Sequence, residues 1–403
     1  MEKCKNRIIT LSGDPGSGKG SVSRKLNENY EAQGLKSHIV SVGDLFRKIV
    51  VREYKKKFPE VQEPTLEEIY GNPDFAEELK EIDANMDNEI ANLVEEFHSQ
   101  STTGEVLILD SRRAAIIIEK LAEKIPEISQ ICFHVRLETD ARTAGERVFN
   151  DPKRGTEDQY SSLEEAIQDT ESRKEKEIQS CKEQYGKDLS DHSHFNLIIG
   201  TTLASIDDIA STIHTCDKLA SEGKPFAKTW ASPELFYPTQ IIERTNYDVV
   251  WMIEDPEERK NSRDYPFATT KRLRELYPNQ QIDHNTKRVG KWVRGTYDLE
   301  EYAHSIAEKG IYPDKPVDAI SMGKSVYKFV KDGHHRVFGS IMARKTLIPY
   351  RIVEHKEEEI VSQEQIDIIH IHENEIRMLD GSRFKYAVYP EVERENDSNE
   401  QEQ

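Results

Sequence analysis

A glycine-rich segment near the start of the chain has the residue types and spacing that bind a polyphosphate. Residues 13–21 read GDPGSGKGS, and Gly13, Gly18 and Lys19 fit the pattern GxxxxGK. Glycines let backbone N–H groups approach phosphate oxygens without an obstructing Cβ. The lysine ammonium offsets charge on the β and γ phosphates during transfer. The segment therefore predicts ATP binding by these residues: Gly13, Asp14, Pro15, Gly16, Ser17, Gly18, Lys19, Gly20 and Ser21.

The alternative for this segment is a glycine-rich turn that binds no ligand. An apolar strand, the loop, the lysine and a helix follow one another in the order that a phosphate-binding loop needs. This order favours the phosphate-binding loop. Position 20 is Gly where most such loops carry the Ser or Thr that binds magnesium, and the hydroxyl group comes one position later, at Ser21.

The elements around this loop predict an α/β fold. The first half of the chain alternates short β-rich runs with longer amphipathic segments, which is typical of a parallel sheet with crossover helices. The expected strands are residues 7–12, 37–42, 106–110, 130–135 and 195–199. The expected helices are residues 21–33, 75–98, 114–124, 140–149, 163–185 and 206–219. A P-loop domain is therefore expected over residues 1–218.

A second, smaller α+β domain is expected over residues 225–390, after a polar linker at 221–225 that contains Gly and Pro. Its expected elements are β-type runs in 238–253, a polar loop at 255–264, helices at 297–309 and 337–345, and strands at 325–330 and 348–353. Acidic residues dominate after residue 353, and residues 391–403 are expected to be a disordered tail.

Composition limits the class of protein. The net charge of -19 over 403 residues argues against a broad nucleic-acid surface, which needs clustered Lys and Arg. The four cysteines form no CxxC pair and are typical of reduced thiols in the cytosol. No apolar run is long enough for a signal peptide or a membrane helix. We therefore expect a cytoplasmic protein without a membrane partner, and the sequence does not indicate its oligomeric state.

Four segments resemble motifs of the nucleoside monophosphate kinases, particularly the cytidylate kinases and their archaeal-type relatives. They are GKGS at 18–21, SVGDLFR at 41–47, VLILDSRRA at 106–114 and YGKDLSDHSHFNLIIGTT at 185–202. The resemblance spans roughly residues 5–215. It implies that Ser41, Gly43 and Arg47 hold an acceptor nucleotide. It also implies that Arg112 contacts the phosphate of that acceptor.

Magnesium is the expected cofactor besides ATP, with Ser21 and Asp110 as its binding residues. Asp110 ends an apolar strand beside the glycine-rich loop, where a carboxylate can hold a magnesium-bound water. The alternative role for Asp110 is to cap the helix that follows. The alternative for Arg47 is a surface arginine on a helix.

Phosphoryl transfer needs cations around the moving group because its charge is spread over several oxygens. The resembled family supplies them from a mobile, arginine-rich lid, and residues 150–160 (NDPKRGTEDQY) have the composition of such a cover. The candidate cations are Arg142, Arg147, Lys153, Arg154 and Arg173. Arg147 and Arg173 are predicted to be catalytic together with Lys19. A solvated helix end is the alternative for this charged segment.

Residues 310–353 resemble the ParB/sulfiredoxin superfamily, with DGHHR between a strand and a helix. This resemblance implies a nucleotide-phosphate site at Asp332, Gly333, His334, His335 and Arg336. A tight turn that caps the helix and a metal site at the two histidines are the alternatives. His334 replaces the sulfiredoxin cysteine, which argues against sulfinic-acid repair, and the acidic sequence after 353 argues against DNA binding. Glu243 lies where free-serine kinases of this superfamily carry a catalytic glutamate.

Together these features predict an ATP-dependent phosphotransferase that transfers the γ-phosphoryl group in line to a nucleoside monophosphate. Ser111 and Ser180 replace the Gly and Arg of archaeal-type cytidylate kinases, so the acceptor base stays open. Two alternatives also stay open. One is a kinase for a small metabolite such as an amino acid or a sugar. The other is a non-enzymatic, nucleotide-controlled switch that acts on the second domain.

Overall fold

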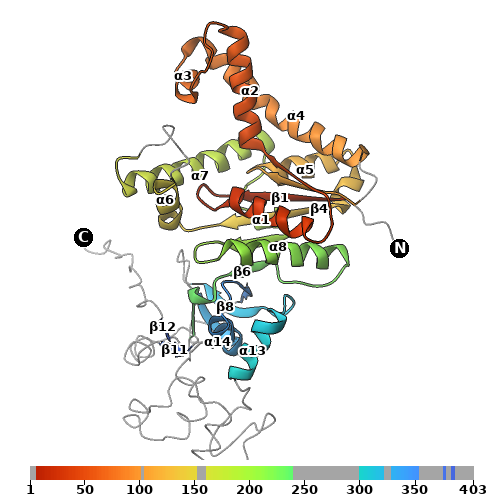
Figure 1. Ribbon diagram of the computed structural model, residues 1–403, viewed down its shortest axis with the longest axis vertical. Helices are drawn as coiled ribbons and strands as arrows, with labels where there is room; N and C mark the ends of the chain where they lie inside the picture. Colours follow the sequence, from red (N-terminus) through yellow and green to blue (C-terminus); the bar gives the residue numbers. More distant parts are fainter. Residues whose placement is uncertain are drawn as a thin grey trace, which may run out of the picture. The chain divides into compact units, whose positions relative to one another are not determined.

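The computed structural model describes residues 6–100, 104–151, 160–238, 299–321, 328–353, 375–377 and 383–385 (Figure 1). The chain divides into two compact units. The first comprises Met1–Leu235, Tyr312–Pro316 and Thr346–Arg351, and the second comprises Phe236–Ile311, Val317–Lys345 and Ile352–Gln403. The domain limits expected from the sequence, at residues 218, 225 and 390, stay predictions.

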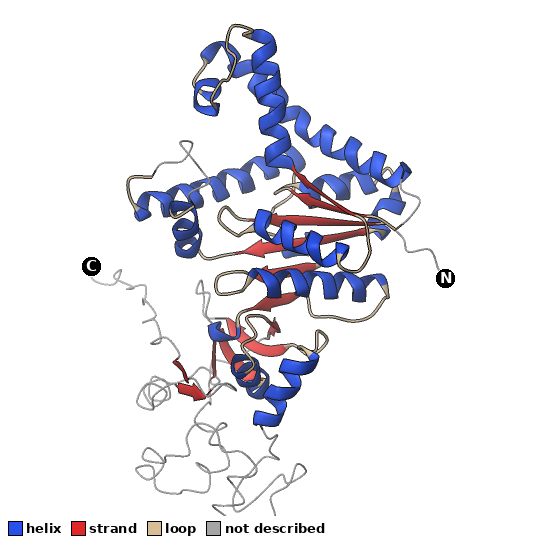
Figure 2. Cartoon of the chain, in the orientation of Figure 1, coloured by secondary structure: helices blue, strands red, loops and turns tan. Residues whose placement is uncertain are grey.

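A largely parallel sheet forms the core of the first unit (Figure 2). Its strands lie in the order β2 (Ser37–Ser41), β3 (Val106–Asp110), β1 (Arg7–Gly13), β4 (Cys132–Glu138), β5 (Leu197–Gly200), β6 (Thr229–Ala231) and β10 (Ile348–Ile352). Neighbouring strands are parallel except for β6 and β10. β1 is buried because β3 and β4 pair with its two edges and helices cover both faces of the sheet (Figure 1), as its apolar sequence predicts. The five strands expected in the first half are confirmed, and β6 was not predicted.

Helices cover both faces of this sheet (Figure 1). The helices of the first unit are α1 (Lys19–Glu31), α2 (Val42–Lys57), α3 (Leu66–Tyr70), α4 (Ala76–Gln100), α5 (Ala114–Ala122), α6 (Ala141–Phe149), α7 (Leu163–Tyr185) and α8 (Ile206–Ser221), with short 3-10 turns η1 (Pro73–Phe75), η2 (Pro126–Gln130) and η4 (His192–His194). On one face, α4 and α5 bury Val94 and Ile118 against Ile8 of β1. α1 and α8 pack together on the other face. Within the described residues, no helix is both long and apolar enough to cross a bilayer.

The helices α2 and α3, which follow the start of the SVGDLFR motif at 41–47, were not predicted. α2 follows Ser41 directly, and the Ser41 hydroxyl accepts a hydrogen bond from the Asp44 N–H at 3.3 Å, so Ser41 is the N-cap of this helix. Val50 and Tyr54 on α2 pack with Ile69 of α3 and Phe75 of η1 in a small separate core. The motif at 41–47 therefore lies at the start of a helical subdomain.

The buried Asp217 carboxylate connects three elements of the first unit that are far apart in the sequence, namely β1, α1 and α8. Asp217 of α8 is 4 % exposed. It accepts hydrogen bonds from the Tyr30 hydroxyl of α1 at 2.8 Å and from the Arg7 Nε of β1 at 2.9 Å. Burial and the neighbouring carboxylate raise the pKa of Tyr30, so its hydroxyl remains a donor at neutral pH.

The second unit contains α13 (Leu299–Lys309), α14 (His334–Met342), β7 (Phe236–Pro238), β8 (Val317–Ser321) and β9 (Lys328–Asp332). β9 pairs antiparallel with β8 and parallel with β7. A further antiparallel pair is β11 (Glu375–Arg377) with β12 (Arg383–Lys385). The helix expected at 337–345 begins earlier, directly after Gly333, whose φ is +100°. Residues 239–253, the loop at 255–264 and the tail at 391–403 lie outside the described residues.

We predict that Tyr30→Phe lowers the free energy of unfolding by about 1.5–3 kcal/mol, because it removes a buried hydrogen bond to a charged group. Urea denaturation measures this change. Tyr312→Phe is the matched control, since Tyr312 is 43 % exposed, and it should change the free energy by less than about 0.5 kcal/mol. Equal effects of the two substitutions would contradict the role of the Asp217 contact.

Candidate active site

A pocket of about 1260 Å³ opens in the first unit where β1, β2 and β3 end. Leu11 and Ser41 are the register partners of Asp110 on the two sides of β3, so β2 and β3 end level and β1 continues two residues further, to Gly13. Ligands of open parallel sheets bind beyond the carboxyl ends of the strands. This pocket therefore lies where the fold predicts a binding site.

The glycine-rich loop between β1 and α1 lies tightly against neighbouring backbone. A Cβ on Gly13 would lie 2.5 Å from the carbonyl oxygen of Leu137, and a Cβ on Gly16 would lie 2.6 Å from that of Ala144. Gly16 also has a φ of +72°, in the left-handed region that favours glycine. The loop thus needs glycine at both positions for steric reasons, in addition to any contact with a ligand.

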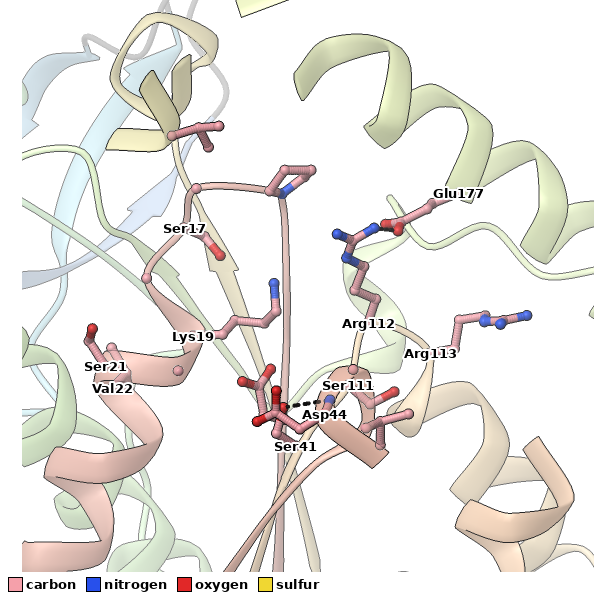
Figure 3. Close-up of a pocket in the computed structure, with 18 of the residues that line it drawn as sticks. Ser17, Lys19, Ser21, Val22, Ser41, Asp44, Ser111, Arg112, Arg113 and Glu177 are labelled. Carbon is pink, nitrogen blue, oxygen red and sulfur yellow. Dashed lines mark hydrogen bonds and ion pairs between the residues drawn. The ribbon is translucent and has the colours of Figure 1, made fainter. Parts of the chain in front are cut away.

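Lys19 is the first residue of α1 and lies at the centre of the site (Figure 3). Its ammonium group donates hydrogen bonds to the carbonyl oxygens of Gly13 at 2.8 Å and Asp14 at 3.3 Å. Removal of this group from solvent lowers the pKa of Lys19 to about 8, although the Asp110 carboxylate acts in the opposite direction. The loop carbonyls therefore hold a lysine that is charged at neutral pH and that lines the pocket.

Other predicted residues of this loop have different surroundings. Pro15, Ser17, Gly18, Gly20 and Ser21 line the pocket. The buried Ser17 hydroxyl has no hydrogen-bond partner within the described part of the chain. The Asp14 carboxylate is instead paired with Arg136 of β4 and Lys174 of α7. Sequence reasoning missed both of these partners.

The two predicted magnesium-binding residues both line the pocket. Burial raises the pKa of Asp110, and the nearby Lys19 opposes that rise. The Ser21 hydroxyl accepts a hydrogen bond from Arg24 at 3.2 Å. α5 has Arg113 at its N-cap position, so Asp110 does not cap that helix. One carboxylate, a hydroxyl and the oxygens of phosphate and water form a donor set that suits Mg²⁺.

Arg47 and Arg112, which the resemblance assigns to acceptor binding, are each paired with a carboxylate. Arg47 of α2 pairs with Asp44, and Arg112 pairs with Glu177 of α7. Figure 3 shows Arg112 and Glu177 facing each other across the pocket from Lys19. Gly43 lies beside the Arg47 guanidinium, which would be 3.6 Å from a Cβ at that position. The predicted acceptor residues are therefore brought together, but with bound carboxylates that the sequence did not indicate.

A second polar group, around Arg113, lines the same pocket. Arg113 donates to the Gln184 side-chain oxygen at 2.8 Å and lies 3.6 Å from both Asp83 and Asp87 of α4. Burial raises the pKa of Asp87, and Arg113 opposes that rise. Phe46, Met86 and Ile90 supply apolar wall in the same pocket.

The predicted lid cations have separate environments. Arg147 of α6 lines the pocket, and its guanidinium donates to the carbonyl oxygens of Gly16 at 3.2 Å and Thr201 at 2.7 Å. Arg173 pairs with Asp169 at 2.8 Å and is not among the pocket-lining residues. α7 instead contributes Lys176, Glu177 and Ser180 to the pocket.

The remaining lid candidates are Arg142, which does not line the pocket, and Lys153 and Arg154, which are not among the residues that the structure describes. Arg142 is exposed and pairs with Glu146 at 3.0 Å. Lys153 and Arg154 lie outside the described residues. The spacing of Lys176, Glu177 and Ser180 follows one face of a helix, and this periodicity was the signal that could have identified them.

The residues predicted to bind phosphate in the second unit lie at the start of α14. Arg336 approaches Asp332, with 3.4 Å between Nη2 and Oδ2, and its guanidinium lies within 3.1 Å of a Cβ placed on Gly333. The side chains of His334 and His335 lie outside the description. The phosphate site expected here stays a prediction.

Comparisons with known proteins agree with this geometry in the first unit. Residues 12–167 match the family model described as AAA domain. The N-terminal half has the P-loop kinase fold. The cytidylate kinase of Methanopyrus kandleri is 29 % identical over 206 residues, which are 51 % of this chain and 90 % of the relative. That of Pyrobaculum arsenaticum is 26 % identical over 221 residues, 53 % of this chain and 95 % of the relative.

One solved structure that the chain matches is a shikimate kinase from Acinetobacter baumannii in complex with shikimate. It is 18 % identical with a TM-score of 0.30, and the match covers 53 % of this chain and 93 % of that chain.

Gly16→Ala should lower the free energy of unfolding by more than Gly34→Ala does. Both glycines have a positive φ, at +72° and +78°, but only Gly16 faces backbone atoms that a Cβ would overlap. We expect about 1–2 kcal/mol for Gly34→Ala, from the backbone conformation alone. Urea denaturation of the two variants measures the difference. A cost for Gly16→Ala no greater than that for the control would contradict the steric role of the loop.

The affinity for a polyphosphate such as ATP should depend on pH through Lys19. Its pKa of about 8 means that the ammonium is charged below pH 8 and neutral above it. We expect constant affinity between pH 6.5 and 7.5, and a loss approaching tenfold per pH unit above about pH 8, since only the charged form attracts phosphate. Calorimetric titration with Mg-ATP measures this profile. Lys19→Met should abolish the inflection, and its persistence in this variant would assign the titration to another group.

Proposed function

We propose that the first unit is an ATP-dependent phosphotransferase and that its acceptor is a nucleoside monophosphate. The observation that carries this proposal is that one pocket contains both Lys19 of the glycine-rich loop and Arg112 after β3. The pocket volume of about 1260 Å³ exceeds the range of roughly 300–1,000 Å³ that is usual for a single small ligand. This size supports the simultaneous binding of a donor and an acceptor.

The loop supplies the groups that hold the donor. Backbone N–H groups at the start of α1 and the positive end of its helix dipole favour phosphate oxygens. Lys19 exchanges its two carbonyl acceptors for the β and γ phosphates, and its charge stabilises the negative charge of the transition state. Asp110 and Ser21 would hold Mg²⁺, which would supply positive charge that offsets the negative charge of the phosphates.

The acceptor side supports an anionic acceptor. A phosphate that binds Arg112 replaces the Glu177 carboxylate as its partner, whereas a neutral sugar leaves that ion pair intact. The apolar wall of Phe46, Met86 and Ile90 suits the faces of a nucleobase, and the group of Arg113 with Asp83 and Asp87 suits its polar edge. This combination favours a nucleotide over a sugar or an amino acid.

The proposed reaction is a direct in-line displacement. An oxygen of the acceptor phosphate forms a bond to the γ phosphorus while the bond from that phosphorus to the β–γ bridging oxygen breaks. ADP leaves with the electron pair. Arg147 is proposed to approach the donor from α6, since its guanidinium already contacts the loop at Gly16. The role of Arg173 is proposed to be the support of α7 through its pair with Asp169.

For the second unit, we keep the ParB/sulfiredoxin-like interpretation as a hypothesis. The order of β9, Gly333 and α14 supports it, because a left-handed glycine precedes a helix that carries Arg336 near its start. Arg336→Ala in a turnover assay tests whether this unit contributes to transfer.

The activity should appear as ADP formation that requires one nucleoside monophosphate from a panel of CMP, UMP, AMP and GMP. Lys19→Ala should lower kcat by about 10²- to 10³-fold, because it removes a cation that acts in the transition state.

Arg112→Ala should raise the KM for the acceptor and leave the KM for ATP unchanged. Arg52→Ala is the matched control, since Arg52 is exposed on α2 and pairs with Glu53.

Three results would overturn the proposal. Full turnover by Lys19→Ala would remove the donor site from the mechanism. Phosphoserine or a sugar phosphate as the product would make the chain a small-metabolite kinase. Slow hydrolysis of ATP that no acceptor accelerates would favour the nucleotide-controlled switch.

A further inference from the structure

A buried ion cluster lies directly behind the glycine-rich loop. Asp14, the second residue of that loop, is 5 % exposed, and Arg136 of β4 is 4 % exposed. Arg136 Nη2 donates to Asp14 Oδ1 at 2.5 Å, and Lys174 Nζ of α7 donates to Asp14 Oδ2 at 2.9 Å. One carboxylate therefore receives a cation on each of its two oxygens, from two elements distant in sequence.

The other surroundings of Arg136 fix its orientation. Its Nε lies 3.8 Å from the Glu138 carboxylate, which in turn contacts His192 at 2.9 Å. Its guanidinium carbon lies 5.8 Å from the ring centre of Phe195. Packing and charge on several sides thus hold the arginine where it meets Asp14.

The main chain of Asp14 also forms hydrogen bonds with Ser17 and Lys19 of the loop. Its carbonyl oxygen accepts hydrogen bonds from the Lys19 ammonium at 3.3 Å and from the Ser17 N–H at 3.2 Å. Its N–H donates to the carbonyl oxygen of Leu137, next to Arg136 on β4, at 3.4 Å. The anchored side chain therefore fixes the peptide units from which Lys19 is held.

A carboxylate in a loop that receives a polyphosphate is unfavourable unless it is neutralised. An unpaired buried carboxylate is itself costly, and it would repel the phosphates that the loop N–H groups attract. Two cations on Asp14 remove both effects.

We infer that Arg136 and Lys174 are positioning residues for donor binding: they neutralise Asp14 and hold the loop in the conformation that accepts the triphosphate. This inference rests on the proposed function. It assigns a role in ATP affinity to residues of β4 and α7 that do not belong to the glycine-rich sequence.

The test compares Arg136→Met, Asp14→Asn and the double variant by calorimetric titration with Mg-ATP, with the folded fraction measured by circular dichroism. Arg136→Met should weaken ATP binding at least tenfold, and adding Asp14→Asn should restore most of that affinity because the repelling charge is gone. Turnover should show a raised KM for ATP with a smaller change in kcat. A purely structural role would lower stability without rescue of affinity in the double variant.

Lys174→Met gives a second, milder measurement, because the Lys174 side chain is 44 % exposed and its loss disturbs the core less than loss of Arg136. It should weaken ATP binding about threefold if its charge contributes. Lys182→Met is the matched control on α7, since Lys182 pairs with Asp188 instead, and it should leave affinity unchanged.

Unchanged affinity in folded Arg136→Met or in Lys174→Met would overturn the inference, as would failure of Asp14→Asn to rescue Arg136→Met. If the wild-type chain binds Mg-ATP and the variants behave as expected but no acceptor is phosphorylated, the proposed function fails and the positioning role stands. Absence of ATP binding in the wild-type chain overturns both.

Discussion

The close contact of the glycine-rich loop with the backbone of β4 and α6 is the constraint that determines the geometry of the rest of the site. The carbonyl oxygens of Leu137 and Ala144 leave no space for a Cβ at Gly13 or Gly16. The loop must therefore pass close to β4 and α6, and this path directs the carbonyl oxygens of Gly13 and Asp14 toward Lys19. The start of α1 then faces the pocket with its N–H groups and its lysine together.

Charge in the pocket is balanced locally although the chain as a whole is strongly acidic. Arg47, Arg112 and Arg113 each have a carboxylate neighbour in the structure without a ligand. A phosphate group that enters competes with those carboxylates, and an uncharged molecule does not. A chain with a net charge of -19 thus contains a pocket with three arginines, and under the proposed function an anionic acceptor exchanges with their carboxylate partners.

Local signals predicted the sheet and the glycine-rich loop, because both depend on short runs of sequence. β1 and β3 are largely apolar runs, β4 alternates apolar with polar residues, and the loop has fixed spacing. The partners of Asp14 could not be predicted in this way, since Arg136 and Lys174 come from β4 and α7 and meet it only in the folded chain. Arg173 was chosen for its charge and lies on the same face of α7 as Lys176 and Glu177, but one turn earlier in the helix. Lys176 and Glu177 line the pocket and Arg173 does not, because that depends on which turn of α7 reaches the pocket in the folded chain. α2 was missed because its residues were interpreted as a binding motif and not as a helix.

The strand β10 has a consequence for the order in which the protein acquires its structure. Residues Thr346–Arg351 belong to the first compact unit, and β10 pairs antiparallel with β6 through Ile348, Pro349 and Tyr350. A ribosome delivers β6 long before β10, so the newly made sheet has an unpaired edge at Thr229–Ala231 throughout that interval. The nascent chain is therefore exposed to strand addition by other molecules at this edge until the late segment arrives. The sheet of the first unit is complete only after most of the second unit has been translated.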